Sequence, residues 1–299
     1  VHTLTLHLNL VASSLYPQIG IAGGYLSYYG FSEGLKRMKA QGYECLDDAL
    51  LANTDNAIFS ATPAEFERKL TERRKEIEDN GIIVSQTHGP WRWPPKDATE
   101  EDRKERFEKM SMAIIGTALM GTKNFIIHPI MPYGCDRERN PRMMWEMNLD
   151  FFGKLLEVAI ANDVIINFEN MPMVALAMAS VPSTLDFVKA INSPNFKMCL
   201  DTGHCAILGT DIGEAVRLIG KDYLQTLHVH DNNGNNDSHW IPYTGVCNWS
   251  DFAKALQEID FQGSMSLETF IPRQIPDDLR PLQEQSLFQM ACKIAGRTF

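Results

Sequence analysis

Short apolar runs recur along the chain, and most of them end on a histidine or an acidic residue. Each run is rich in Ile, Val, Phe and Leu and has the length of a β-strand, and a segment with helical patterning precedes nearly every one. Six runs end in this way, at His88, His128, Glu169, Asp201, His230 and Glu268. Two further runs, 3–11 and 42–50, bring the expected number of strands to eight.

Strands that alternate with helices are typical of a parallel sheet. Eight such strands in 299 residues fit one (β/α)8 barrel, the TIM barrel, better than two domains. We therefore expect an α/β fold with a single TIM-barrel domain over residues 1–299. In barrels of this kind the reacting groups lie where the strands end, which is where this sequence has its histidines and carboxylates.

The alternation within each run predicts which face points into the barrel. Residues two positions before a strand end share its face, and most of them are polar or small: Gln86, Ile126, Asn167, Cys199, His228 and Ser266. The residues between are large and apolar, as packing beneath a helical layer requires: Ile127, Phe168, Leu200, Val229 and Leu267. His228 and His230 are both expected to point inward. His230 is one layer nearer the mouth, which favours it as a ligand with His228 as its support.

The residues at the strand ends are of the types that bind metal ions. Carboxylates and imidazoles in one small space repel each other unless a divalent cation joins them. A carboxylate that ends a buried strand must be paired, protonated or metal-bound, which makes Glu169 and Glu268 strong candidates. His88 and His128, each alone on an apolar strand, could instead be hydrogen-bonded core histidines. The recurrence at six strand ends favours a metal-centred active site.

Loop segments add candidates that also have ordinary explanations. The DTGH segment at 201–204 brings His204 back over the mouth, although such a turn can be only a hydrogen-bonded corner. Asp237 and His239 form a D-x-H pair in an Asn-rich loop, a pattern moderately specific for a metal that could also be a solvated turn. Aromatic residues beyond the strand ends could stack on a sugar ring or only cover the edge of the core: Trp91, Trp93, Trp240 and Tyr243.

Composition sets broad limits on function and partners. The formal net charge of −10 argues against broad binding to a phosphate backbone, although a local metal could still attract an anion. No run approaches the roughly 18 apolar residues of a membrane span, and the first residues alternate like a strand rather than forming a signal-peptide core. The six cysteines show no CxxC pair, which suggests reduced thiols. We expect a soluble, cytoplasmic protein with no membrane partner.

In their order along the chain, these residues resemble the xylose isomerase-like barrel superfamily. That superfamily includes sugar isomerases, ketose 3-epimerases, inosose dehydratases and endonuclease IV. The resemblance covers essentially the whole chain and rests on His88, His128, Glu169, the DTGH segment 201–204, His230, Asp237, His239 and Glu268. These motifs are specific for the superfamily, but they give only weak evidence of which reaction is catalysed.

The resemblance to ketose 3-epimerases implies a mononuclear metal site. By that resemblance Glu169, Asp201, His230 and Glu268 bind one Mn²⁺, Co²⁺, Mg²⁺ or Zn²⁺. Glu169 and Glu268 then flank the carbon that loses its proton, one removing a proton and the other returning one on the opposite face. A cation at the carbonyl stabilises an enediolate by several kcal/mol. Residues expected to contact a sugar or sugar derivative are His88, Trp91, His128, His204 and Trp240.

Departures from this pattern keep other functions open. Ketose 3-epimerases carry an arginine shortly after the histidine of the seventh strand, whereas this chain has Asp231 followed by two asparagines. The resemblance to endonuclease IV implies additional ligands for three zinc ions, namely His88, His128, His204, Asp237 and His239. Against a nuclease stand the missing basic residues near the mouth and the segment 243–249, YTGVCNW, where a glycine-rich turn is expected.

A metal-dependent sugar isomerase or epimerase is therefore the first hypothesis. A dehydratase or lyase acting on a keto-sugar would use the same machinery, and a multi-zinc phosphodiesterase is the alternative from another class. A barrel that only binds a sugar or a partner subunit fits the intact ligand set less well. The absence of a glycine-rich phosphate loop favours an unphosphorylated substrate. Nucleic acid is an unexpected partner, and association into a homo-oligomer is common among such barrels.

Overall fold

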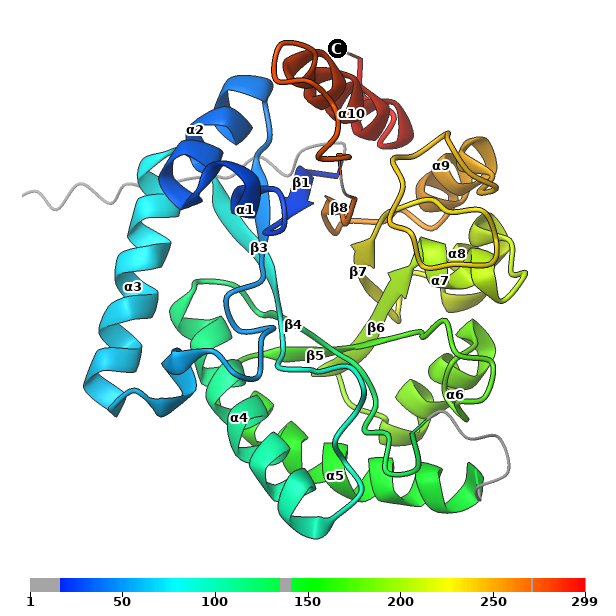
Figure 1. Ribbon diagram of the computed structural model, residues 1–299. Helices are drawn as coiled ribbons and strands as arrows, with labels where there is room; N and C mark the ends of the chain where they lie inside the picture. The colour runs from blue at the N-terminus through cyan, green and yellow to red at the C-terminus, as the bar shows by residue number, and fades with distance from the viewer. Residues whose placement is uncertain (1–16, 135–140, 270, 299) are drawn as a thin grey trace, which may run out of the picture.

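Eight parallel strands form a nearly closed barrel surrounded by helices, as predicted (Figure 1). The computed structural model describes residues 17–134, 141–269 and 271–298. The strands follow the sheet order β7-β6-β5-β4-β3-β2-β1-β8, with bounds β1 Ile19–Ala22, β2 Cys45–Asp48, β3 Ile83–His88, β4 Asn124–Ile127, β5 Ile165–Glu169, β6 Phe196–Asp201, β7 Leu224–His228 and β8 Met265–Leu267. A parallel bridge between Val229, which directly follows β7, and Leu267 of β8 joins the two ends of this sheet.

The first described strand of the barrel is one that the sequence did not suggest. The expected strand at 3–11 lies outside the described residues, and the barrel's first strand is Ile19–Ala22, between β2 and β8. A Cβ on Gly20 would lie 2.6 Å from Sγ of Cys45, so close contact with β2 requires glycine there. A four-residue strand that contains glycine and precedes Gly23 and Gly24 looks like a turn in the sequence, which explains the error.

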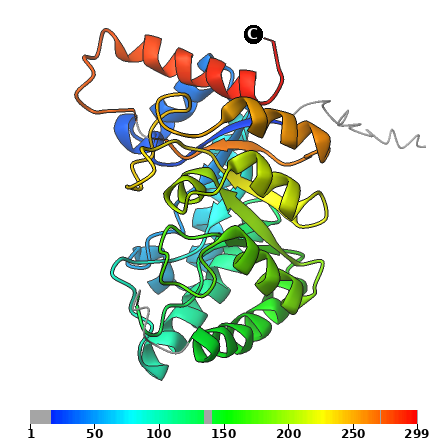
Figure 2. The ribbon, with the colours of Figure 1, turned by 90° about the vertical axis from the view of Figure 1, so that its right-hand side faces the viewer.

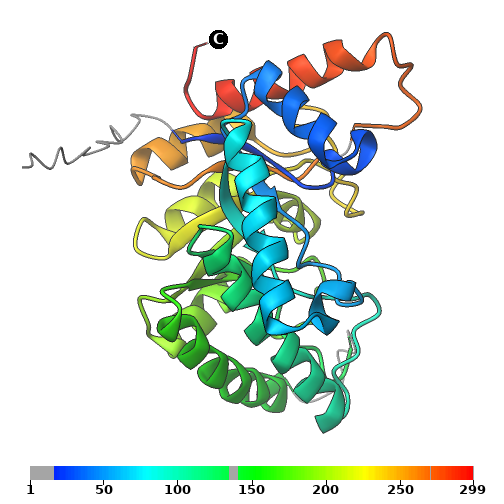
Figure 3. The same ribbon diagram turned by 90° about the vertical axis from the view of Figure 1, so that its left-hand side faces the viewer.

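Helices form the outer layer, with α3 and α4 along one side (Figure 3) and α8 and α9 along the other (Figure 2). Thr99 and Asp102 form a capping box at the start of α4. In the described part of the chain, no helix has the length and apolar character needed to cross a membrane. The helical elements are α1 Leu26–Tyr29, α2 Phe31–Gln41, η1 Ala57–Ser60, α3 Pro63–Asp79, α4 Glu100–Leu119, α5 Pro141–Ala161, α6 Val181–Ile191, α7 Thr202–Ile207, α8 Ile212–Ile219, α9 Trp249–Glu258 and α10 Arg280–Ile294.

The two faces of the strands separate apolar packing from polar contacts. Phe168 of β5 packs outward, with its ring centroid 5.0 Å from that of Phe152 in α5 and 4.8 Å from that of Phe187 in α6. Gln86 of β3 points inward, and its side-chain amide donates to the backbone oxygen of Leu227 on β7 across the barrel. The predicted faces are confirmed for these strands. The barrel interior is therefore the side that can present polar groups at the mouth.

Candidate metal centre

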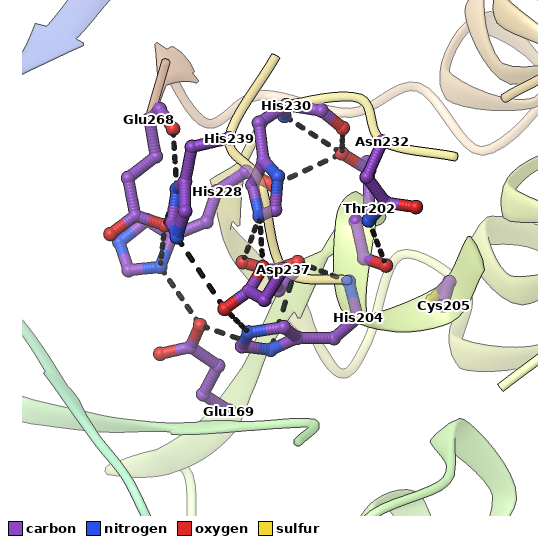
Figure 4. Close-up of polar contacts among 12 residues, drawn as sticks. Glu169, Thr202, His204, Cys205, His228, His230, Asn232, Asp237, His239 and Glu268 are labelled. Atoms are coloured by element: carbon purple, nitrogen blue, oxygen red, sulfur yellow. Dashed lines mark hydrogen bonds and ion pairs between the residues drawn. The ribbon is translucent and has the colours of Figure 1, made fainter. Parts of the chain in front are cut away.

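The six residues singled out at the strand ends gather at one rim of the barrel. Figure 4 shows three of them, Glu169, His230 and Glu268. Parallel strands all end at the same rim, so residues far apart in the sequence meet there. Side chains of Glu169 and Asp201 are almost completely buried, whereas Glu268 keeps 26% of its side-chain surface exposed. Access to solvent at the centre is therefore on the side of β8.

Glu169 lies at the middle of the first group of ligand atoms. Its Oε1 is 3.0 Å from Nδ1 of His228, and its Oε2 is 3.1 Å from Nε2 of His128 and 3.6 Å from Nε2 of His88. Burial opposes ionisation of Glu169, but the facing His228 and His128 hold its pKa well below the usual range. Burial lowers the pKa of His128 to about 4, so this imidazole is neutral at pH 7 and keeps a lone pair.

The DTGH segment is built around His230. Asp201 caps α7 by accepting the backbone N–H of His204 at 2.7 Å, and its other oxygen lies 3.0 Å from Nε2 of His230. Thr202 binds both backbone groups of His230, donating to its oxygen at 2.7 Å and accepting from its nitrogen at 2.9 Å. A Cβ on Gly203 would lie 2.0 Å from the His230 ring, so only glycine leaves room for it.

Three histidines share one hydrogen-bonding arrangement. Their Nδ1 atoms lie 2.7–2.8 Å from backbone carbonyl oxygens: His88 on Gly89, His204 on Asn170 and His239 on Glu268. A carbonyl oxygen only accepts, so each Nδ1 carries a proton and Nε2 is the atom left for a cation or a second proton. Metal-binding histidines are commonly fixed in this way.

In the absence of a cation, protons take that place at two of these histidines. Nε2 of His204 and Nε2 of His239 lie 3.3 and 3.5 Å from Oδ2 of Asp237. Burial opposes protonation of His204, but Asp201, Asp237 and Glu169 raise its pKa to about 10. Burial likewise opposes protonation of His239, but Asp237 and Glu268 raise its pKa to about 9. Their positive charges hold the pKa of Asp237, which burial would raise, well below its usual range.

The structure brings three of the four predicted ligands into one group. Ligand atoms of Glu169, Asp201 and Glu268 lie within 4.8 Å of one another, together with His228. His230 belongs to two neighbouring groups, one with Asp201 and His204 and one with His239 and Glu268. A further group joins His88, His128 and Glu169. That His230 completes the mononuclear set with Glu169 therefore stays a prediction.

The donor atoms fit a divalent cation. Carboxylates of Glu169, Asp201 and Asp237 are held close together with imidazoles, a set of oxygen and nitrogen ligands that suits Mn²⁺, Co²⁺ or Zn²⁺. Nδ1 of His230 is buried and has no hydrogen-bond partner within the described ranges. The other ring nitrogen, Nε2, lies 3.0 Å from a carboxylate oxygen of Asp201 and 3.8 Å from one of Asp237, so it faces carboxylates that a cation could join to it.

Two acidic residues that support the centre were missed in the sequence. Asp47 of β2 is buried, and its Oδ2 lies 3.0 Å from Nε2 of His228 and accepts from Gln86 at 2.9 Å. Asp231 accepts from the backbone nitrogen atoms of Gly245 and Cys247 and from the indole of Trp249. The available signal was an acidic residue within an apolar run, at 45–48 and after 224–230. Their partners are distant in sequence and gave no local pattern.

The expected aromatic residues stand at the rim. The ring centroid of Trp91 lies 5.1 Å from that of His128, and 42% of the residue is exposed. Trp240 exchanges two backbone hydrogen bonds of 2.8 Å with Asp231 and is 39% exposed. Both indoles therefore offer partly exposed surface near the centre. Their contact with a sugar stays a prediction.

Comparison with known proteins identifies the family. The sequence model described as "Xylose isomerase-like TIM barrel" matches residues 35–288. The chain belongs to this family. Within this xylose isomerase-like family, D-psicose 3-epimerase from Ruminiclostridium cellulolyticum is 27% identical over 232 residues, covering 71% of this chain and 73% of that protein.

Solved structures share the fold at lower identity. The structure of 3-keto-D-glucoside 4-epimerase from E. coli has a TM-score of 0.71 at 15% identity, covering 91% of this chain and 99% of that one. The structure of the protein IolI with a bound zinc atom has a TM-score of 0.71 at 16% identity, covering 93% of this chain and 96% of that one. At these identities the likeness shows the shared barrel.

Proposed function

We propose that this xylose isomerase-like barrel is a metal-dependent sugar epimerase that inverts a carbon beside a carbonyl. The observation that carries the proposal is the pair Glu169 and Glu268. Nδ1 of His228 lies 3.0 Å from a carboxylate oxygen of Glu169 and 3.4 Å from one of Glu268. In the sheet, β6 and β7 separate β5 from β8, so the two carboxylates approach the mouth from different directions. An epimerase needs such a pair, one carboxylate for each face of the reacting carbon.

In this mechanism one of the two carboxylates removes the proton beside the carbonyl. The other then delivers a proton to the opposite face, which inverts the carbon. Glu169, Asp201, His230 and Glu268 would hold the cation, which supplies positive charge that stabilises the negative charge of the enediolate. The partly exposed Glu268 is the member of the pair with direct access to incoming substrate.

The assignment of His230 as ligand and His228 as support follows from their partners. Both ring nitrogens of His228 face carboxylates, those of Glu169 and Asp47, each at 3.0 Å. Burial opposes protonation of His228, but Glu268 and Glu169 raise its pKa well above the usual range, which favours a doubly protonated ring. His230 turns its Nε2 toward the carboxylates of Asp201 and Asp237, at 3.0 and 3.8 Å. In the proposal, His228 therefore orients the two carboxylates and His230 binds the cation.

The related proteins support epimerisation over dehydration or lyase chemistry. D-psicose 3-epimerase and 3-keto-D-glucoside 4-epimerase are both named for inversion of a sugar carbon. A keto-sugar dehydratase or lyase would begin with the same proton removal, and only its second half would differ.

A multi-zinc phosphodiesterase resembling endonuclease IV is the second candidate. The observation that favours it is the presence of ligand groups beyond the mononuclear set, His88 with His128 and Asp237 with His204 and His239. The net charge of −10 counts against it, because a nuclease must approach a polyanion.

Solvent deuterium exchange tests the proposal. The metal-stripped protein is reloaded with Mn²⁺, Co²⁺, Mg²⁺ or Zn²⁺ and incubated with a set of ketoses in D₂O, and deuterium on carbon is followed by NMR. We expect deuterium exchange that depends on the metal and that Glu268→Gln abolishes, because an amide cannot take up and release a proton as a carboxylate does. Metal binding should weaken only in part, because the amide keeps an oxygen that can bind the cation. Glu108→Gln, an exposed change on α4, is the matched control. Metal-dependent cleavage of abasic DNA without exchange on any ketose would refute the epimerase and support the second candidate.

A further inference from the structure

The geometry points to a binding subsite for an anionic group of the substrate, a carboxylate or a phosphate, in a pocket beside the metal centre. This inference rests on the proposed function, because it assigns where the far end of the sugar lies. The pocket has a volume of about 230 Å³ and lies between α1, the segment after β8 and the start of α10. In Figure 1, α1 and α10 lie on the two sides of β1.

The pocket adjoins the candidate catalytic residues through the chain itself. Its wall includes Thr269, which directly follows Glu268, and Gly24, which lies two residues beyond the end of β1. β1 and β8 are paired neighbours in the barrel. A sugar whose carbonyl lies at Glu268 can therefore extend its chain along this side of the mouth.

Arg280 is a buried cation in this wall, and no acidic residue in the described ranges forms an ion pair with it. Only 3% of the residue is exposed, and its guanidinium stacks on the ring of Tyr28 at 3.8 Å from the centroid. One nitrogen donates to the backbone oxygen of Pro272 at 3.0 Å, while Nε is buried and has no hydrogen-bond partner in the part of the chain that the structure describes. An unpaired buried charge is unfavourable, and an anion bound in the pocket would offset that cost.

The acidic residues nearby are already engaged with other donors. Glu284 accepts from the hydroxyl of Tyr29 and from the side-chain amide of Gln41 at 2.7 Å. Asp277 accepts from the hydroxyl of Tyr28 at 3.1 Å. Among the described residues, neither forms an ion pair with Arg280. The guanidinium is therefore available to a ligand.

Two further groups fit an anion at the same place. Oγ1 of Thr269 is buried without a hydrogen-bond partner among the described residues, and a hydroxyl can donate to an anionic oxygen. Arg273 lines the pocket from its exposed side and adds a second positive charge. A neutral hydroxyl could occupy the space but would leave the charge of Arg280 unpaired, so the substrate class indicated is a sugar acid or a sugar phosphate. A sugar acid agrees with the unphosphorylated substrate that the sequence favoured, whereas a sugar phosphate differs from it.

The test compares anionic and neutral ketoses with the metal-loaded protein. D-fructose, D-fructose 6-phosphate and D-fructuronate are used, and kcat/KM for deuterium exchange and binding by calorimetry are measured for each. Preference is the ratio of kcat/KM for the anionic sugar to kcat/KM for the neutral sugar. We expect wild-type protein to prefer one anionic sugar, which identifies the anion as phosphate or carboxylate. Arg280→Gln should lower that ratio at least about tenfold, as expected for a charged hydrogen bond.

Arg73→Gln is the matched control, since Arg73 also stacks on an aromatic ring, that of Phe31, at 3.8 Å from the centroid, but neither residue lines the pocket. It should leave the ratio unchanged. Should Arg280→Gln fail to fold, Arg273→Gln on the exposed rim of the pocket takes its place in the test. An unchanged ratio in Arg273→Gln then overturns the subsite.

The two proposals fail in different ways in this experiment. Exchange on neutral and anionic sugars with no preference overturns the subsite and leaves the epimerase standing. Anion binding that depends on Arg280, without exchange on any sugar, supports the subsite and overturns the epimerase.

Discussion

Asp47 holds His228 on the side away from Glu169, so a residue of β2 controls the geometry of a centre built from other strands. The imidazole lies between Oδ2 of Asp47 and Oε1 of Glu169, each at 3.0 Å. A ring with carboxylates at both ends has one favoured orientation, and it transmits that orientation to Glu169. Asp47 acts through another residue and is a positioning residue.

Replacing Asp47 with asparagine should weaken the centre without removing its ligands. The amide loses the charge that faces His228, so we expect metal affinity or exchange rate to fall about 10–100-fold, as is usual for groups behind a metal ligand. Metal competition assays and deuterium exchange measure the two effects. Asp48→Asn is the control, because Asp48 is equally buried but pairs with Arg73 instead. Equal losses of metal affinity in both variants would show that Asp47 has only a structural role.

At the scale of the element, the loop between β7 and α9 is held in place by Asp231. Its carboxylate accepts from the backbone nitrogen atoms of Gly245 and Cys247 and from the indole of Trp249, at 2.9–3.2 Å. A Cβ on Gly245 would lie 2.2 Å from this carboxylate, so the loop passes it closely. Asp237 and His239 lie within this loop and owe their position to it.

Asp231→Asn should release the loop while leaving the strand-end ligands in place. An amide cannot accept on its nitrogen, so hydrogen bonds to the loop are lost at a cost of about 1–3 kcal/mol. Hydrogen exchange should show reduced protection over 231–249 and unchanged protection in β5 and β6. Asp211→Asn is the control, since Asp211 caps α8 and asparagine caps equally well. Unchanged protection of the loop in Asp231→Asn would contradict this account.

The sequence predicted some elements and residues better than others. Those defined by a local pattern were predicted, whereas those defined by contacts with distant residues were missed. Strand ends such as Glu169 and Asp201 stood out because a polar residue closes a local apolar run. β1 was missed because its short, glycine-containing strand is defined by its pairing with β2 and β8. The roles of Asp47 and Arg280 depend on partners in other elements, which no local pattern reveals.

At the scale of the whole molecule, charges on the outer helices and charges at the mouth are balanced differently. On α3, acidic and basic residues pair with each other one turn apart, as in Arg68 with Glu72 and Lys75 with Asp79. At the mouth, the carboxylates of Glu169, Asp201 and Asp237 form ion pairs only with imidazoles among the described residues. A neutral imidazole cannot balance a carboxylate, so the mouth attracts either protons or cations.

Protons and cations should therefore compete for the mouth. The competition should be weak at His128 and Glu169 and strong at Asp237, His204 and His239. His128, with a pKa of about 4, is neutral at pH 7, so a cation bound there with Glu169 displaces no proton from this ring. His204 and His239, with pKa values of about 10 and 9, hold protons at pH 7 that a cation beside Asp237 must displace. The affinity of that side for a cation should rise with pH up to about 9–10 and then level off. Calorimetry in buffers of different ionisation enthalpy counts the protons released between pH 6.5 and 8.5.

His239→Ala separates the two proposed functions by the same measurement. In a mononuclear epimerase, the variant should keep its one cation and its deuterium exchange, because His239 lies outside the proposed ligand set. In a multinuclear phosphodiesterase, it should lose a cation, the accompanying proton release and the activity together. Loss of deuterium exchange in this variant, with one cation still bound, would contradict the one-cation epimerase, because the proton transfer would then need the loop side of the mouth as well as Glu169 and Glu268.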